Sequence, residues 1–168
     1  MKVVFSHGKE SGPWGSKITR LAHTARSRGF TVDSIDYTDI MDGDERVLRL
    51  IETLAEADQK LLLVGSSLGG YVSLVASRSI VVDGLFLLAP ALYMPGLAVQ
   101  SYDSRCSDIE IVHGWADEVI PAEHSIRFAR SAQCTLHMVQ ADHRLMAALD
   151  RIDLIFRLFL QRHQEFGA

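Results

Sequence analysis

The stretch from Leu61 to Gly70 constrains the fold of this 168-residue chain more than any other. It reads Leu-Leu-Leu-Val-Gly-Ser-Ser-Leu-Gly-Gly, so a short apolar run enters a Gly-x-Ser-x-Gly motif, after which Val72, Val75 and Ala76 recur at helical spacing. A run of this kind is typical of a fully buried strand, and the spacing after it predicts a helix. The chain therefore turns sharply from strand to helix at a serine.

The serine of that turn is Ser67, because only this register places glycines two positions before and two positions after it. Gly65 and Gly69 lack the bulk that would keep the strand and the helix apart, and such a turn holds its serine in a strained backbone conformation. Ser66 has no glycines at the corresponding positions. The motif also fits a tight turn without chemistry, so a chemical role for Ser67 depends on partners elsewhere in the chain.

The composition is that of one soluble globular domain, which we expect to cover residues 1–168. Charged residues make up 23% of the sequence and hydrophobic residues 48%. The formal net charge of -4 and the pI near 5.9 leave no basic surface for nucleic acid and no polybasic patch for a membrane. We therefore expect neither nucleic acid nor a membrane as a partner.

The cysteines and the first residues favour a cytoplasmic location. Cys106 and Cys134 form no CxxC pair and are too few for the disulfide framework of a small secreted domain. The chain begins Met-Lys and leads directly into the apolar residues 3–5, without the longer apolar core and cleavage site of a signal peptide. No apolar run approaches the length needed to span a membrane.

Strand and helix patterns alternate about six times along the chain. Strands are predicted at residues 2–6, 31–37, 61–64, 84–89, 109–113 and 135–139. Helices are predicted from an N-cap at Ser16 to a stop at Gly29, across residues 47–54, after Gly70, from Pro121, and over roughly 149–162. Several strands are too apolar to have a solvent-facing side. This predicts an α/β fold with about six mostly parallel strands and helices on both faces.

One connection differs from the rest. Residues 91–108 are long and carry no clear helical stripe, although a short helix would fit there. Long loops in compact domains are usually functional or mobile. In open parallel sheets the ligand crevice lies at the carboxyl ends of the strands, so Ser67, the loop of residues 7–15 and this loop are expected to meet there.

A serine hydroxyl becomes a good nucleophile only when a base takes its proton and a third group orients the base. Of the seven histidines, only His143 lies in the loop that follows the last predicted strand. Asp117 follows the fifth strand and is the preferred acid, with the adjacent Glu118 as an alternative. Asp142 is interpreted as a solvated or loop-capping residue. His7 and His113, at strand ends, are interpreted as residues that order loops.

Four motifs together resemble the α/β-hydrolase superfamily, and specifically its compact bacterial esterases without a cap domain. They stand in family order at the ends of predicted strands: His7-Gly8, Gly65-Ser66-Ser67-Leu68-Gly69, His113-Gly114-x-x-Asp117 followed by Val119-Ile120-Pro121, and Asp142-His143. The resemblance covers essentially the whole chain, with the first two strands of the family missing.

The resemblance implies a Ser-His-Asp triad. Ser67 would attack an acyl carbonyl, His143 would take and return the proton, and Asp117 would fix the imidazole tautomer. The backbone N–H groups of Leu68 and Lys9 would form the oxyanion hole. An acyl pocket is one interpretation, and simple packing the other, for the apolar loop residues Trp14, Tyr93, Met94, Leu97 and Trp115. The Lys9 ammonium could attract an acidic substrate, but a solvated surface lysine is the alternative.

The function expected from this resemblance is a serine carboxylesterase acting on small or short-acyl esters. Three alternatives remain: a thioesterase, a catalytically silent hydrolase fold that binds a partner, and a flavodoxin-like nucleotide binder. Residues 8–17 lack the Gly-Lys-Ser/Thr ending of a phosphate loop, and histidines and cysteines are too scattered for a zinc site. We expect no cofactor and no metal, and a small-molecule ester as the partner. The oligomeric state is left open.

Overall fold

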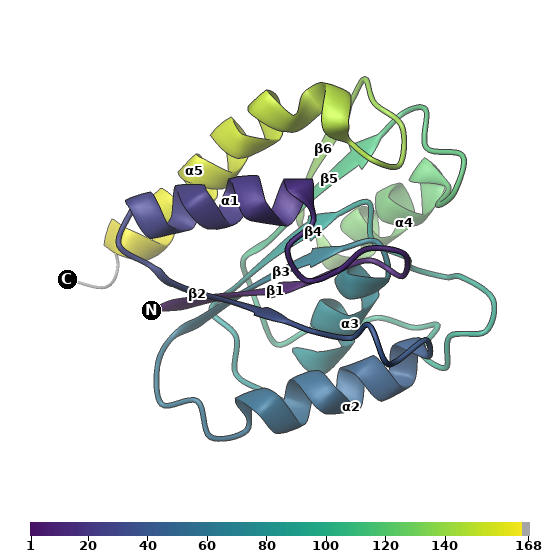
Figure 1. The fold of residues 1–168 in the computed structure, drawn as a ribbon. Helices are drawn as coiled ribbons and strands as arrows, with labels where there is room; N and C mark the ends of the chain where they lie inside the picture. Colours follow the sequence, from purple (N-terminus) through teal and green to yellow (C-terminus); the bar gives the residue numbers. More distant parts are fainter. Residues whose placement is uncertain (166–168) are drawn as a thin grey trace.

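Six parallel strands form one sheet in the order β2-β1-β3-β4-β5-β6 in the computed structural model, which describes residues 1–165 (Figure 1). The strands are β1 (Lys2–Ser6), β2 (Thr31–Ile35), β3 (Leu61–Ser66), β4 (Gly84–Leu88), β5 (Ile109–Gly114) and β6 (Thr135–Val139). The predicted α/β class and parallel sheet are confirmed. The second strand is two residues shorter than predicted because it ends at Ile35.

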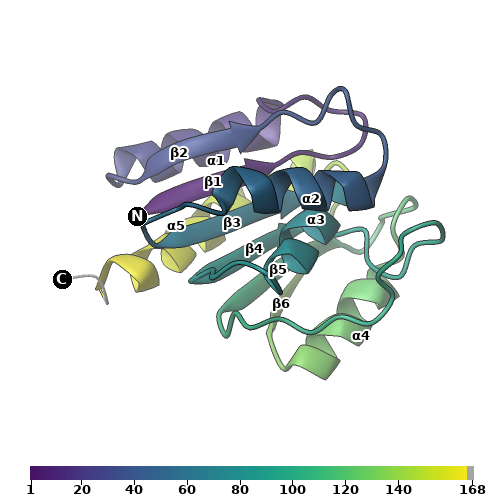
Figure 2. The ribbon, with the colours of Figure 1, turned by 90° about the horizontal axis from the view of Figure 1, so that it is seen from below.

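Helices cover both faces of the sheet, as predicted (Figure 2). One face carries α1 (Ser16–Ser27) and α5 (Leu149–Glu165), the latter preceded by a 3₁₀ turn, Met146–Ala148. The other face carries α2 (Gly43–Leu54), α3 (Leu68–Ala76) and α4 (Ala122–Ala132). Within residues 1–165, no helix combines the length and apolar character that crossing a membrane requires.

The strand before Ser67 shows why the sheet must be covered on both sides. Side chains alternate across a strand, so Leu61 and Leu63 pack on the α2 and α3 face, whereas Leu62 and Val64 pack on the α1 and α5 face. Each of these side chains is buried. The fully buried strand predicted from the apolar run is therefore confirmed.

The N-termini of α1 and α2 are capped in different ways. Ser16 is the first residue of α1 and not its N-cap, because Gly15 occupies the cap position and no side chain caps the helix. Asp42 caps α2, since its Oδ1 accepts the backbone N–H of Asp44 at 2.8 Å and that of Glu45 at 3.0 Å. The predicted N-cap at Ser16 was wrong, and the capping aspartate was not singled out.

The loop of residues 91–108 contains no helix and is bonded to the helices beneath it. Asp44 Oδ2 of α2 accepts the Ala98 N–H at 3.0 Å, and the hydroxyl of Tyr71 in α3 accepts the Val99 N–H at 3.2 Å. The Tyr71 hydroxyl also donates to Asp44 Oδ1. These bonds hold the middle of the loop against α2 and α3.

The order of the strands reverses between β1 and β3. The chain runs from β1 outward to β2 and then returns to place β3 on the other side of β1. In doubly wound sheets, ligands bind at such a reversal, outside the carboxyl ends of the strands. Nucleotide-binding proteins share this strand order, so the order alone does not decide the function.

Candidate active site

Ser67 occupies the turn between β3 and α3 in a conformation that a non-glycine residue rarely adopts. Its backbone angles are φ 55° and ψ −118°, and holding a residue in so sparsely populated a region costs on the order of 1–3 kcal/mol. Neighbouring backbone groups fix the turn: the Ser67 N–H donates to Leu88 O at 2.9 Å, and Ser67 O accepts the N–H groups of Gly70 and Ala91 at 2.9 Å each. The strained turn predicted from the motif is confirmed.

The two flanking glycines make different close approaches. A Cβ at Gly65 would lie 2.3 Å from the carbonyl oxygen of Gly69, so this glycine lets strand and helix meet, as predicted. A Cβ at Gly69 would lie 2.0 Å from the carbonyl oxygen of Ser6. Gly69 therefore allows α3 to approach the end of β1, which brings the following loop next to Ser67.

Replacing Gly69 with alanine is expected to destabilise the fold by more than about 4 kcal/mol, because the new methyl group meets backbone atoms that cannot rotate away. Gly12→Ala is the matched control, since a Cβ at Gly12 would meet no atom within 4 Å. Urea unfolding followed by circular dichroism compares the two variants. A Gly69→Ala protein as stable as Gly12→Ala would contradict the close approach between α3 and β1.

His143 joins Ser67 to Asp117. It lies in the loop after β6, and its Nε2 is 3.0 Å from Ser67 Oγ while its Nδ1 is 2.8 Å from Asp117 Oδ2. An ionised carboxylate can only accept, so Nδ1 carries the proton and donates to Asp117. In the neutral ring Nε2 is then free to accept the Ser67 hydroxyl proton. The structure thus brings together the three residues that the sequence analysis selected.

The Asp117 carboxylate is fully buried and surrounded by donors. Its Oδ1 accepts the backbone N–H groups of Val119 at 2.9 Å and Ile120 at 2.8 Å, and Nε2 of His113 lies 3.1 Å from its Oδ2. Burial by itself would raise the pKa of Asp117, but the hydrogen bonds from Ile120, His143 and Val119 outweigh it and hold the pKa below its ordinary 3.8. The carboxylate is therefore ionised at neutral pH, and the stability it contributes is lost only as the pH falls through this lowered pKa.

Two residues near Asp117, Glu118 and His113, were also considered in the sequence analysis. Glu118 is exposed, and the carboxylate that contacts His143 is that of Asp117. His113 is fully buried, with its Nδ1 2.7 Å from Ser125 Oγ and its Nε2 3.0 Å from Ile120 O. Burial lowers the pKa of His113 and keeps the ring neutral. His113 orders the loop after β5 through its contact with Ile120 O, as interpreted from the sequence. Its contact with Asp117 was not predicted, although its position four residues earlier could have suggested it.

Two charged residues, Asp142 and Lys17, lie near His143 and Asp117. Asp142 is exposed and its Oδ1 accepts the Arg144 N–H at 3.0 Å, which agrees with the interpretation of a loop-capping residue. Lys17, in the first turn of α1, was not singled out from the sequence. Burial lowers the pKa of its ammonium to about 8, while the carboxylates of Asp117 and Asp142 act in the opposite direction. A positive charge at neutral pH therefore lies near the Asp117–His143 pair.

The backbone N–H groups of Lys9 and Leu68 have no hydrogen-bond partner in residues 1–165. Leu68 follows Ser67 directly and begins α3. Gly8 lies beside Ser67, since a Cβ built on Gly8 would be 3.5 Å from the Cβ of Ser67. The first residues of the loop after β1 therefore lie beside Ser67, and the role of the Lys9 and Leu68 N–H groups as oxyanion donors stays a prediction.

The five predicted pocket residues lie in different surroundings. Tyr93, Met94 and Leu97 pack against the core on the α2, α3 and α4 face. The Trp14 ring lies 5.2 Å from the guanidinium carbon of Arg26. Arg26 stands in the last turn of α1, so the Trp14 side chain lies along this helix. Trp115 is 58% exposed, immediately after β5. Their role in substrate binding stays a prediction.

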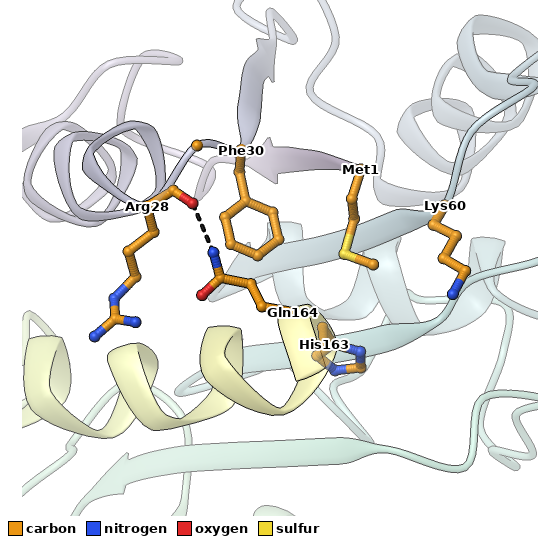
Figure 3. Close-up of a pocket in the computed structure, with 7 residues that line it drawn as sticks. Met1, Arg28, Phe30, Lys60, His163 and Gln164 are labelled. Carbon is orange, nitrogen blue, oxygen red and sulfur yellow. Dashed lines mark hydrogen bonds between the residues drawn. The ribbon is translucent and has the colours of Figure 1, made fainter. Parts of the chain in front are cut away.

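A cavity of about 370 Å³ lies at the end of the sheet opposite to Ser67 and His143 (Figure 3). Its walls are Met1, Arg28, Gly29, Phe30, Lys60, His163 and Gln164, and the Gln164 side chain donates to Arg28 O at 2.7 Å across it. Met1, Phe30 and Lys60 precede β1, β2 and β3, so this cavity is at the amino ends of the strands. A second cavity, of about 410 Å³, lies between α2, α3 and residues 103–105. Neither is lined by Ser67 or His143.

A parallel sheet with Ser67, His143 and Asp117 at its carboxyl edge defines the class of this protein: it belongs to the α/β-hydrolase superfamily. A candidate hydrolase of this superfamily from Xanthomonas campestris pv. campestris is 33% identical, with 96% of this chain and 98% of that chain covered and a TM-score of 0.88. Within the superfamily the chain belongs to uncharacterised protein family UPF0227, whose model matches residues 2–102. None of the curated proteins compared with the chain matches it.

More distant structures share the fold. Est1E from Butyrivibrio proteoclasticus is 18% identical, with a TM-score of 0.78 over 96% of this chain and 87% of that one. A serine hydrolase without lid from Xanthomonas campestris is 22% identical, with a TM-score of 0.76 over 95% and 81%. At these identities the likeness shows the fold alone. The resemblance that the motifs indicated is confirmed at the level of the superfamily.

Proposed function

We propose that this chain, as a single domain over residues 1–168, is a serine hydrolase that cleaves small carboxylic esters through an acyl-enzyme intermediate. The observation that carries the proposal is the unbroken series of hydrogen bonds from Ser67 Oγ through His143 to the buried Asp117 carboxylate. A serine hydroxyl, an imidazole in the required tautomer and an ionised carboxylate are the groups that acyl transfer needs.

The first step follows from the tautomer of His143. Ser67 Oγ attacks the carbonyl carbon of the ester while Nε2 of His143 takes the hydroxyl proton. The imidazolium formed is stabilised by Asp117, whose carboxylate stays ionised because its pKa is lowered. The same Nε2–H then gives its proton to the leaving alcohol, and the acyl group remains on Ser67. Water, activated by His143 in turn, releases the acid and restores the hydroxyl.

The negative charge that develops on the carbonyl oxygen requires donors fixed in advance. In this proposal the N–H groups of Leu68 and Lys9 supply them, and loss of one such donor typically costs about 10²- to 10³-fold in kcat. Both donors belong to the backbone, so the exposed Lys9 side chain is free to serve another purpose.

We expect small esters to be the preferred substrates, since neither of the two cavities described above is lined by Ser67. Ser67 is itself half-buried, at the carboxyl edge of the sheet. Among the structurally similar proteins, Est1E has been observed with ferulic acid bound. An acyl group held only by surface residues such as the exposed Trp115 gains little from added length.

Recombinant protein is expected to hydrolyse nitrophenyl acetate and butyrate faster than the nitrophenyl esters of long fatty acids. A fluorophosphonate should label Ser67, as identified by mass spectrometry of the tryptic peptides. Acetyl-CoA and butyryl-CoA, assayed beside the oxygen esters, separate an esterase from a thioesterase. A folded protein whose intact Ser67 takes no fluorophosphonate label would refute the serine hydrolase proposal.

A further inference from the structure

Arg46 of α2 is a fully buried arginine whose guanidinium hydrogen-bonds only to backbone carbonyl groups within residues 1–165. Nε donates to Ile40 O at 2.8 Å, and Nη2 donates to Tyr37 O at 3.3 Å. Nη1 donates to His7 O at 3.4 Å and to Gly8 O at 3.2 Å. Four carbonyl groups from two separate loops thus converge on one cation.

Burying a guanidinium at this position costs more free energy than burying an aliphatic side chain of similar volume would. Arg46 stands on the apolar face of α2, four residues before Leu50 and eight before Leu54, where an aliphatic side chain would pack. A buried charge without a paired carboxylate carries a large desolvation cost. Here the four carbonyl dipoles offset it together with the Tyr37 ring, whose centroid lies 5.3 Å from the guanidinium carbon, and the charge of Asp39. The fork of the guanidinium can hold several carbonyl groups in fixed directions, which a point charge cannot do.

His7 fixes one of the same carbonyl groups from a second direction. The Tyr37 N–H donates to His7 Nε2 at 3.0 Å, so the ring proton must be on Nδ1. Nδ1 lies 2.7 Å from Gly8 O and donates to it. Burial lowers the pKa of His7, and the charge of Arg46 acts in the same direction, so the ring is neutral. The Gly8 carbonyl oxygen therefore accepts two hydrogen bonds on the inner side of the loop.

The direction of the Gly8 carbonyl determines the direction of the next N–H. In a planar trans peptide the C=O and the N–H point to opposite sides. With Gly8 O bound to Arg46 and His7, the Lys9 N–H must point outward from that side. Gly8 itself lies beside Ser67, and the Lys9 N–H has no partner among residues 1–165.

We propose that Arg46 is a positioning residue which, together with His7, locks the Gly8–Lys9 peptide so that the Lys9 N–H is fixed as an oxyanion donor before substrate binds. The inference rests on the serine hydrolase function proposed above. A donor held in place needs no reorganisation as charge develops, and this is where the rate advantage of an oxyanion hole comes from. Arg46 touches neither substrate nor Ser67, so its effect on catalysis passes through the loop.

The variant that tests this is Arg46→Lys, with Arg49→Lys as its matched control on the same helix. Arg49 carries the same side chain but pairs with Asp39 at 2.6 Å on the surface and makes no hydrogen bond to residues 7–9. Lysine keeps the charge at position 46 but cannot hold four carbonyl groups. For Arg46→Lys we expect kcat on nitrophenyl acetate to fall by about tenfold or more while KM stays within about twofold. For Arg49→Lys we expect neither constant to change.

Backbone ¹⁵N relaxation gives a readout that does not depend on turnover. In the wild-type protein the Lys9 amide is expected to be as rigid as the amides of β1, and in Arg46→Lys it should become mobile while the β1 amides stay unchanged. A mobile Lys9 amide in the wild-type protein overturns the inference even if Arg46→Lys does not fold. A folded Arg46→Lys protein with wild-type kcat also overturns it.

The two proposals fail in different ways. If the wild-type protein hydrolyses esters but Arg46→Lys equals it in kcat and in Lys9 rigidity, the positioning role is refuted and the hydrolase function stands. If the wild-type protein shows no turnover and Lys9 nevertheless loses its rigidity in Arg46→Lys, the lock on the peptide is real and the hydrolase function fails.

Discussion

Replacing Ser67 with alanine is expected to reduce kcat for short-chain nitrophenyl esters by about 10⁴-fold or more, because the variant has no atom that can form the acyl-enzyme. KM should change little, since the side chain lost is small and the backbone donors remain. The fold should persist, because the bonds that fix the turn come from the Ser67 backbone. Initial rates and a thermal melt measured on the same preparation test both statements.

Ser66→Ala is the matched control, since it removes one hydroxyl from the adjacent residue. Ser66 is buried at the end of β3, and the His143 ring contacts Ser67 instead. Its replacement should leave ester hydrolysis within about threefold of wild type. A Ser67→Ala variant that kept wild-type turnover would show that hydrolysis uses another nucleophile. Loss of turnover in both variants would point to damage to the strand rather than to chemistry at Ser67.

Most of the fold could be predicted because apolar runs and turns occur at regular intervals along the chain. The run of four apolar residues before Gly65 cannot leave either side in water, and the structure buries both sides. The ends were harder to place. Ser16 suits an N-cap, but the chain enters α1 through Gly15 and leaves that hydroxyl without a capping bond. Capping depends on the entry direction of the backbone, which a sequence pattern does not specify.

The candidate site was predictable where chemistry is tied to position at strand ends. Ser67, Asp117 and His143 each follow a strand, and parallel strands bring their carboxyl ends to one edge. The contact of His113 with Asp117 and the part played by Arg46 were missed for different reasons. A buried histidine at a strand end suits many structural roles, so the spacing of four residues from Asp117 does not by itself single out this contact. Arg46 is a charged residue on the apolar face of a helix, which is visible in the sequence. The carbonyl groups that it binds, however, come together only in the folded chain.

Replacing Asp117 with asparagine is expected to lower kcat by about 10⁴-fold at neutral pH while leaving the fold intact. The reason is the tautomer of His143. In the wild-type protein Oδ1 accepts the N–H groups of Val119 and Ile120, so the amide oxygen of asparagine should keep that place. Its NH₂ group would then face His143 Nδ1, which would have to accept. The ring proton would move to Nε2, where it prevents uptake of the Ser67 proton.

Glu118→Gln provides the control for this prediction, because it makes the same exchange of carboxylate for amide one residue away on an exposed side chain. We expect its kcat to match wild type. The pH dependence adds a second test: Asp117 has a lowered pKa, and the stability that its carboxylate contributes is lost only as the pH falls below the ordinary value of 3.8 and through that lowered pKa, so the melting temperature of Asp117→Asn should fall less than that of wild type as the medium is acidified below pH 3.8. If Glu118→Gln loses activity and Asp117→Asn keeps it, the acid of the triad is Glu118 and the hydrogen bond between Asp117 and His143 has no part in the reaction.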